Sequence, residues 1–101
     1  MSYIDELCEI IRKLHGATAT HVESVPVRET FNGQTIWDDI VEVFDLQGHP
    51  GTHRVYAWSH ETDDPSDRRR HVTELHIPPV VSPVTAVRAA LVQKDRADAE
   101  A

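Results

Sequence analysis

The chain has 101 residues, of which 40% are hydrophobic and 27% are charged, and its formal net charge is −7 with histidine neutral. These values are typical of one globular domain with a buried core, so we expect a single domain over residues 1–101. The acidic balance disfavours binding to nucleic acid or to anionic membranes. The lone cysteine, Cys8, excludes an intramolecular disulfide and a zinc site built from cysteines.

The targeting signals expected of other compartments are missing from the sequence. No N-terminal stretch has the pattern of a signal peptide, and no apolar segment is long enough to span a membrane. We therefore expect the protein in the cytoplasm.

The first predicted element is a helix over residues 2–15. Ser2 is the expected N-cap, Asp5 completes a capping box, and Gly16 is the expected stop. Cys8 falls on the apolar stripe of this helix, which indicates a small buried side chain and not a reactive thiolate. The stripe consists of Ile4, Leu7, Cys8, Ile11 and Leu14.

A β-hairpin is predicted next, with its turn at Asn32-Gly33. Both residues tolerate the positive φ of a type I′ turn. The hairpin lies within residues 18–46, and a two-residue turn places Phe31 opposite Gln34. Pro26 cannot donate a hydrogen bond to a neighbouring strand, so its strand is expected at a sheet edge.

Counting outward from this turn without a bulge gives one register for the hairpin, and a bulge at Asp38-Asp39 or near Pro26 would shift the inner pairs by one residue. The register without a bulge pairs Ser24 with Val41 and Arg28 with Trp37. A third strand over residues 52–60 is expected to pair with the second so that Val43 faces Val55.

The rest of the chain is predicted to add one strand and one helix. Residues 71–77 have the composition of a fourth strand, after a polar exposed loop at 61–70. Ser82-Pro83 predicts the start of a second helix, with serine as N-cap and proline in the first turn. The charged tail, about residues 94–101, is expected to fray.

The element order α-β-β-β-β-α predicts the α+β class. The simplest packing is a two-layer sandwich, in which an antiparallel sheet of three to four strands carries both helices on one face. The other face would then expose aromatic and aliphatic side chains, and an uncovered apolar face usually marks an interaction site. We therefore expect a small interaction module that binds a protein partner or forms a homodimer through this face. The expected contact residues are Arg28, Ile40, Glu42, Tyr56 and Trp58.

The alternative is a small enzyme or ligand-binding protein. Seven histidines are many for this length, and histidine is the commonest acid–base group. A pocket between the sheet and the 61–70 loop would use His60, His71 or His76. No metal-ligand spacing, phosphate-binding glycine loop or nucleophile-elbow serine occurs, so we expect no metal or cofactor, and an enzyme is the weaker interpretation.

The succession of a helix, three strands and a helix resembles the element order of double-stranded-RNA-binding domains, from which the fourth strand departs. The lysine cluster of that family at the start of the last helix is replaced here by Ser82-Pro83-Val84-Thr85-Ala86. The one basic run is Arg68-Arg69-Arg70, and it follows several aspartates that would cancel much of its attraction for phosphate. Nucleic-acid binding is therefore not expected.

Overall fold

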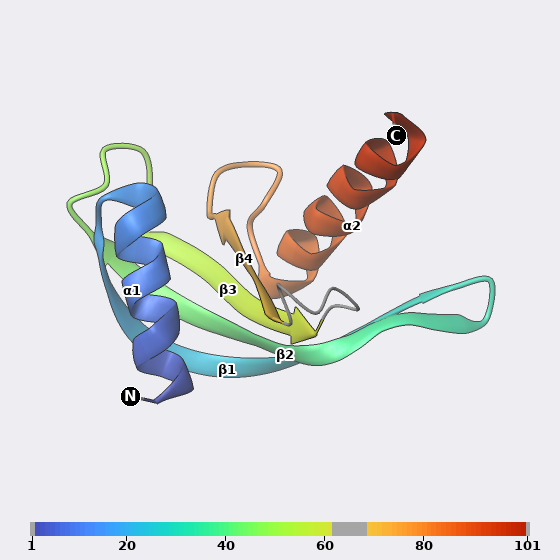
Figure 1. The fold of residues 1–101 in the computed structure, drawn as a ribbon, viewed down its shortest axis with the longest axis horizontal. Coiled ribbons are helices and arrows are strands. Elements are labelled where there is room, and N and C mark those ends of the chain that lie inside the picture. The colour runs from blue at the N-terminus through green and yellow to red at the C-terminus, as the bar shows by residue number, and fades with distance from the viewer. Residues whose placement is uncertain (1, 62–68, 101) are drawn as a thin grey trace.

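The computed structural model describes residues 2–61 and 69–100, with the backbone alone at residue 61 and at residues 94–100. The four strands form one antiparallel sheet in the order β1-β2-β3-β4 (Figure 1). The α+β class and the predicted element order are therefore confirmed, while most of the predicted 61–70 loop lies outside the described residues. The elements are α1 (Tyr3–His15), β1 (Thr18–Phe31), β2 (Gln34–Gln47), β3 (Arg54–Glu61), β4 (Arg69–Leu75) and α2 (Pro83–Glu100).

α1 begins and ends where its local chemistry predicts. The hydroxyl of Ser2 accepts a hydrogen bond from Asp5 N at 3.1 Å, and Ser2 N donates to Asp5 Oδ2 at 3.5 Å. Gly16 ends the helix at φ 65°, a left-handed conformation that glycine adopts without a steric penalty. Leu7 and Ile11 are fully buried, but Leu14, predicted on the same stripe, is 62% exposed.

The β1–β2 turn has the predicted type. Asn32 and Gly33 have φ values of 51° and 77°, and Phe31 pairs with Gln34. An extra residue on β2 and another on β1 then shift the pairing, between Glu29/Thr30 and between His21/Glu23. As a consequence Ser24 faces Glu42, and Arg28 faces Asp38.

The predicted hairpin register is therefore wrong between the two bulges, from Glu23 to Glu29, and agrees with the structure again over Thr18–His21. Ser24 was expected opposite Val41, and the bulge moves it by one residue. Between β2 and β3, Val43 pairs with Tyr56 and not with Val55. A one-residue shift exchanges the two faces of a strand, so these errors change which side chains lie together.

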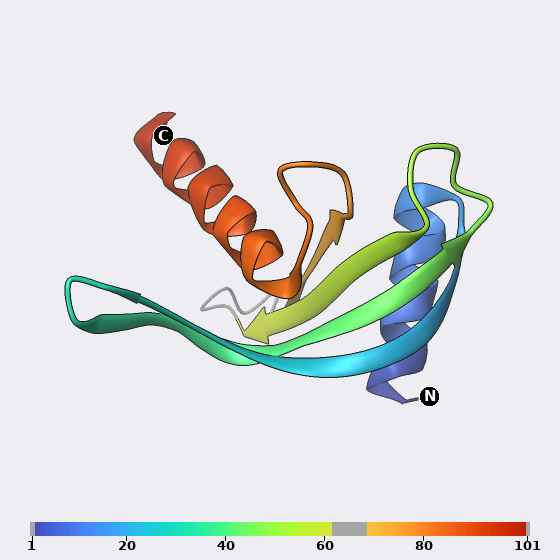
Figure 2. The ribbon, with the colours of Figure 1, turned by 180° about the vertical axis from the view of Figure 1, so that it is seen from behind.

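The two helices lie on opposite faces of the sheet. Figure 1 shows α1 in front of the strands, and Figure 2, from behind, shows the strands in front of α1. Alternate residues of a strand point to opposite faces, and the two helices contact alternate residues. The prediction that both helices cover one face is therefore wrong. α1 packs against Phe44, Leu46, Val55 and Ala57. α2 packs against Val41, Val43, Tyr56 and Trp58.

The side chains of α2 explain why it covers the aromatic face. Ala86 and Val87 are fully buried, and their small size lets the helix axis approach the sheet closely. Tyr56 and Trp58 then bury nearly all of their large apolar surface, and each is only 2% exposed. The face that we expected to remain open is thus the larger of the two cores.

The start of α2 agrees with the prediction. Ser82 caps the helix by accepting a hydrogen bond from Thr85 N at 3.2 Å, and Pro83 is the first helical residue. The backbone is helical to Glu100, and fraying of the tail stays a prediction. Among the described residues no helix is both long and apolar enough to cross a membrane.

The sheet divides beyond the Glu42–Ala57 pair. The β2–β3 ladder extends only over Glu42–Asp45 of β2 and Arg54–Ala57 of β3. Past this point the β1–β2 hairpin continues as a two-stranded ribbon, which projects away from β3 in both views (Figures 1 and 2). We call residues 24–41 the arm.

Candidate functional site

The expected contact residues are divided between the two faces of the sheet. Tyr56 and Trp58 lie in the core beneath α2, so an exposed aromatic face centred on them does not exist in the folded chain. Arg28, Ile40 and Glu42 lie on the opposite face, on the same side as α1. The error follows from the shifted registers and from the assumption that both helices share a face.

The side of the arm opposite α2 has no helix over it. On this side three cross-strand pairs, which include Glu42 at the base of the arm, follow one another, and all of their residues but Glu42 are exposed. We call this surface the open strip. It consists of Ser24, Pro26 and Arg28 on β1 and of Glu42, Ile40 and Asp38 on β2.

Ile40 is the apolar centre of the open strip. It faces Pro26, and its side chain is 42% exposed. Beyond it, Arg28 faces Asp38, so one positive and one negative side chain lie next to the apolar pair. Arg28 Nε and Nη2 donate to Thr35 Oγ1 at 3.2 and 3.0 Å, which holds the guanidinium along the arm.

The backbone N–H of Ile40 has a side-chain acceptor in place of β3. β3 does not pair with β2 at this position, and Ile40 N instead donates to Asp39 Oδ1 at 2.7 Å. The neighbouring carboxylate thus satisfies a backbone group that would otherwise lack a strand partner.

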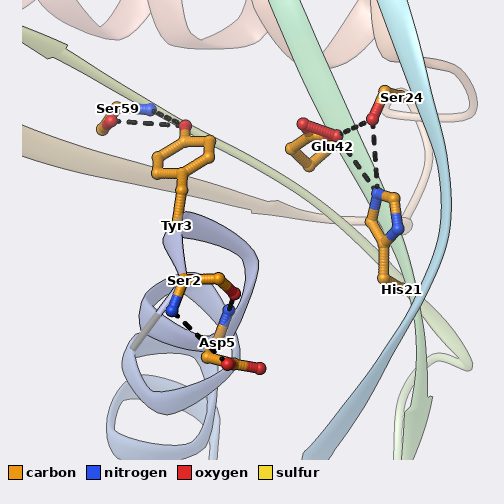
Figure 3. A network of polar contacts seen from close by, with 7 residues as sticks. All are labelled: Ser2, Tyr3, Asp5, His21, Ser24, Glu42 and Ser59. Atoms are coloured by element: carbon orange, nitrogen blue, oxygen red, sulfur yellow. Dashed lines mark hydrogen bonds and ion pairs between the residues drawn. The ribbon is translucent and has the colours of Figure 1, made fainter.

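A polar cluster lies at the base of the open strip. Glu42 is only 5% exposed, and its Oε1 accepts hydrogen bonds from the hydroxyl of Ser24 and from His21 Nε2, the latter at 3.1 Å (Figure 3). The imidazole of His21 packs edge-on against Phe44, with ring centroids 5.4 Å apart. Two donors therefore compensate the burial of this carboxylate.

The cluster contains the residue types of a hydrolytic triad but not their order. In a triad the imidazole stands between the hydroxyl and the acid, so that it can take the hydroxyl proton. Here the hydroxyl of Ser24 donates to the acid, and His21 Nε2 is 3.1 Å from that same Glu42 oxygen and 3.5 Å from Ser24 Oγ. The arrangement stabilises Glu42 and does not activate Ser24.

The three histidines of the alternative pocket are not brought together. His71 faces α1 and lies 2.8 Å from Glu6 Oε1 through its Nε2. His60 lies on the opposite face, near the far end of β3, and is exposed. His76 follows β4 on the side of α2, where its Nδ1 is 2.6 Å from the hydroxyl of Tyr56. Burial raises the pKa of Tyr56, so its phenol stays a hydrogen-bond donor.

A surface depression of about 440 Å3 lies elsewhere than predicted. It is next to residues 51–54, at the opposite end of β3 from the 61–70 loop, and His76 is the only one of the three expected histidines in it. Arg54 Nη2 and Asp45 Oδ1 form an ion pair on its wall at 3.4 Å. Its lining residues are Asp45, Gly51, Thr52, His53, Arg54 and His76.

Sequence reasoning missed Ser24, Pro26, Asp38 and His21 as neighbours of Ile40 and Glu42. The alternation of side chains along the two strands could have identified these neighbours, but the bulges shift the cross-strand pairing by one residue. Among the side chains that the structure describes, at residues 2–60 and 69–93, no three histidine, cysteine or acidic groups converge as metal ligands would.

Comparison with family models, with curated proteins and with solved structures returned no match to this chain.

Proposed function

We propose that the protein is a small interaction module, and not an enzyme, that binds a protein partner through the open strip. The observation that supports this most directly is the 42% exposure of Ile40 at the centre of a ribbon that has no cover on that side. The matching partner surface presents an apolar side chain to Ile40, with an acidic and a basic group placed for Arg28 and Asp38. We also propose that the protein acts in the cytoplasm, as expected from the sequence.

The shape of the arm supports the same proposal. A two-stranded ribbon is only marginally stable in water unless one of its faces is packed. α2 packs on one side of the arm, through Val25, Val27 and Trp37, and the open strip is left for a partner. Exposed apolar side chains are also frequent on this hairpin, since Phe31 is 65% and Ile36 is 50% exposed.

Site-specific photocrosslinking tests the proposal in cells. A benzoylphenylalanine in place of Ile40 is expected to capture a defined partner protein, whereas the same group in place of Val92, exposed on α2, is not. With the purified partner, Ile40→Asp is expected to weaken binding at least about tenfold, or about 1.4 kcal/mol, and Val92→Asp to leave it unchanged. Identical crosslinks from both positions, or equal affinities of both variants, would refute the open strip as the binding surface.

The depression beside residues 51–54 supports a second candidate function, the binding of a small molecule. Its volume of about 440 Å3 falls in the range of ligand sites, and Arg54 with Asp45 offers both signs of charge. NMR titration with a set of small zwitterions separates this function from the first. Saturable shifts confined to Thr52, His53 and His76 would favour it, and their absence would dismiss it.

A further inference from the structure

The outer edge of β4 is a second surface with unused bonding capacity. β4 ends the sheet, and no described strand lies beyond it. His76 N donates to Arg54 O at 2.9 Å, and backbone groups alternate in direction along an antiparallel ladder. The backbone groups of Arg70, Val72 and Glu74 therefore face β3. Those that face outward belong to Arg69, His71, Thr73 and Leu75.

β4 contains no proline, so each of its outward residues has an N–H group to donate, while the outward carbonyl of Leu75 already accepts a hydrogen bond from Ile77 N at 2.8 Å. Seven residues are enough for a short antiparallel pair, and an exposed strand edge is a ready template for pairing with another chain. The side chains of β4 indicate which chain fits this edge.

We propose that two copies of this chain associate through their β4 edges, antiparallel about Val72, into one eight-stranded sheet. A two-fold axis through this point places Val72 opposite Val72 of the second copy. It also places Arg70 opposite Glu74 of the second copy, and Glu74 opposite Arg70, on the face that carries α2. Two ion pairs of opposite charge thus arise from one symmetric register.

The neighbouring register with its axis at Thr73 lacks this complementarity. When the two-fold axis moves by one residue along β4, the partner of each residue moves by two positions, so every side chain stays on its own face of the sheet. Moving the axis to Thr73 sets Arg70 against His76. Moving it to His71 sets Arg70 against Val72 and Glu74 against residue 68, which lies outside the described residues. Among the described side chains, only the axis at Val72 pairs a cation with an anion.

Glu74 supports the pairing from its own environment. Its side chain is half-buried, and no described residue donates a hydrogen bond to it or forms an ion pair with it. Burial raises the pKa of its carboxyl, which reflects a desolvated charge without compensation. A guanidinium from a second copy would supply that compensation.

The other face offers a matching contact from α1. Glu6 Oε1 lies 2.8 Å from His71 Nε2, and His15 Nε2 lies 2.8 Å from Thr73 Oγ1, so α1 contacts β4 through the row that begins at Glu6 and through His15. Ile10 and Leu14 continue the same row at intervals of four residues. In the proposed dimer the two α1 helices lie side by side on one face, and the exposed Leu14 gains a partner there.

This inference goes beyond the proposed function and is independent of it. The arms lie at β1, the opposite edge of the sheet, and would occupy the two outer ends of the dimer. Such a dimer would present two open strips to its partners, which raises the apparent affinity for a partner with repeated sites.

Charge reversal tests the proposal by analytical ultracentrifugation of the full chain. The wild type is expected to dimerise, and both Arg70→Glu and Glu74→Arg to weaken the dimer about tenfold or more through like-charge contacts. The double variant Arg70→Glu/Glu74→Arg restores the pairs and the dimer. An equimolar mixture of the two single variants forms a heterodimer. Arg12→Glu, on an exposed part of α1, leaves the dimer unchanged.

The mixture keeps the test decisive if a single variant is less stable, because association then rescues two weakened chains. A monomeric wild type, a double variant that stays monomeric, or an equal effect of Arg12→Glu would overturn the proposal. A negative result for the dimer would not change the expected photocrosslinks at position 40, so the two proposals are tested separately.

A cysteine at the axis provides a geometric check. Residues opposite each other at a non-hydrogen-bonded position have Cα atoms about 4.5 Å apart, which a disulfide can span. Val72→Cys in a Cys8→Ala background is therefore expected to form a covalent dimer under mild oxidation. Ser24→Cys in the same background is the control, and equal crosslinking of both would contradict the β4 contact.

Discussion

Trp37 of the arm and Trp58 of β3 meet edge to face, with ring centroids 5.6 Å apart and an angle of 72° between the ring planes. They join the two parts of the sheet beyond the point where the β2–β3 ladder ends. Such a pair contributes about 0.5–1.5 kcal/mol beyond its buried area. The arm is thus held to the rest of the sheet by side chains where backbone hydrogen bonds are missing.

Trp58→Ala is expected to destabilise the fold by about 3–5 kcal/mol, since it removes a fully buried indole from the core beneath α2. Urea unfolding followed by circular dichroism measures the change. Val92→Ala, on the exposed side of α2, is the control and should stay within about 0.5 kcal/mol of the wild type. A Trp58 variant as stable as this control would contradict the buried position.

Ser24→Ala is expected to cost about 1–2 kcal/mol, because Glu42 then loses one of the two donors that compensate its burial. Ser24→Thr keeps the hydroxyl and should recover most of that stability. Thr20→Ala, exposed on the same strand, serves as the control in thermal unfolding. Equal losses for Ser24→Ala and Thr20→Ala would mean that the hydrogen bond to Glu42 contributes nothing.

Stability is expected to fall with acidification below about pH 6.5, the ordinary pKa of histidine, through His15. Burial, followed by the nearby His49, lowers the pKa of His15 in the folded chain. The unfolded chain then binds more protons between the two pKa values, so stability rises with pH across that window and is lost as pH falls.

His15→Gln removes this contribution and keeps a polar group near Thr73, whose hydroxyl lies 2.8 Å from His15 Nε2. Unfolding free energies measured in urea at about pH 5.5 and about pH 7.5 are expected to differ less in the variant than in the wild type. An unchanged difference would show that other groups cause the acid sensitivity.

Gly16→Ala is expected to cost about 1 kcal/mol, measured as a lower Tm. A Cβ at this position meets no atom within 4 Å, so the cost comes from the left-handed backbone and not from a clash. Gly16→Asn should cost less, because asparagine tolerates this conformation better. Equal losses for both variants would contradict that explanation.

The features that the sequence predicted correctly depend on residues close together in the chain. The cap at Ser2, the stop at Gly16 and the turn at Asn32-Gly33 are each determined within about four residues. The start of α2 at Pro83 belongs to the same group. Local chemistry of this kind is readable without knowledge of the packing.

The candidate site was less predictable because it depends on registers and on helix placement. The one extra residue on β2 at the bulge between Glu29 and Thr30 was enough to move Glu42 beside Ser24. The alanines of α2 gave no amphipathic signal strong enough to choose a face, and only the packed structure shows that they cover Tyr56 and Trp58. Tyr56 and Trp58 were predicted as contact residues of an exposed face, and the structure places both in the core.

The strand order also bears on how the chain folds. Every strand pairs with its neighbour in sequence, and a helix stands at each end of the chain. Contacts within the sheet are therefore local, which favours rapid formation of hairpins with little loss of loop entropy. Because α1 and α2 pack on opposite faces, either helix can dock onto the sheet before the other does. Two independent docking steps onto a preformed sheet are then the expected folding route, with α1 variants and α2 variants affecting different steps.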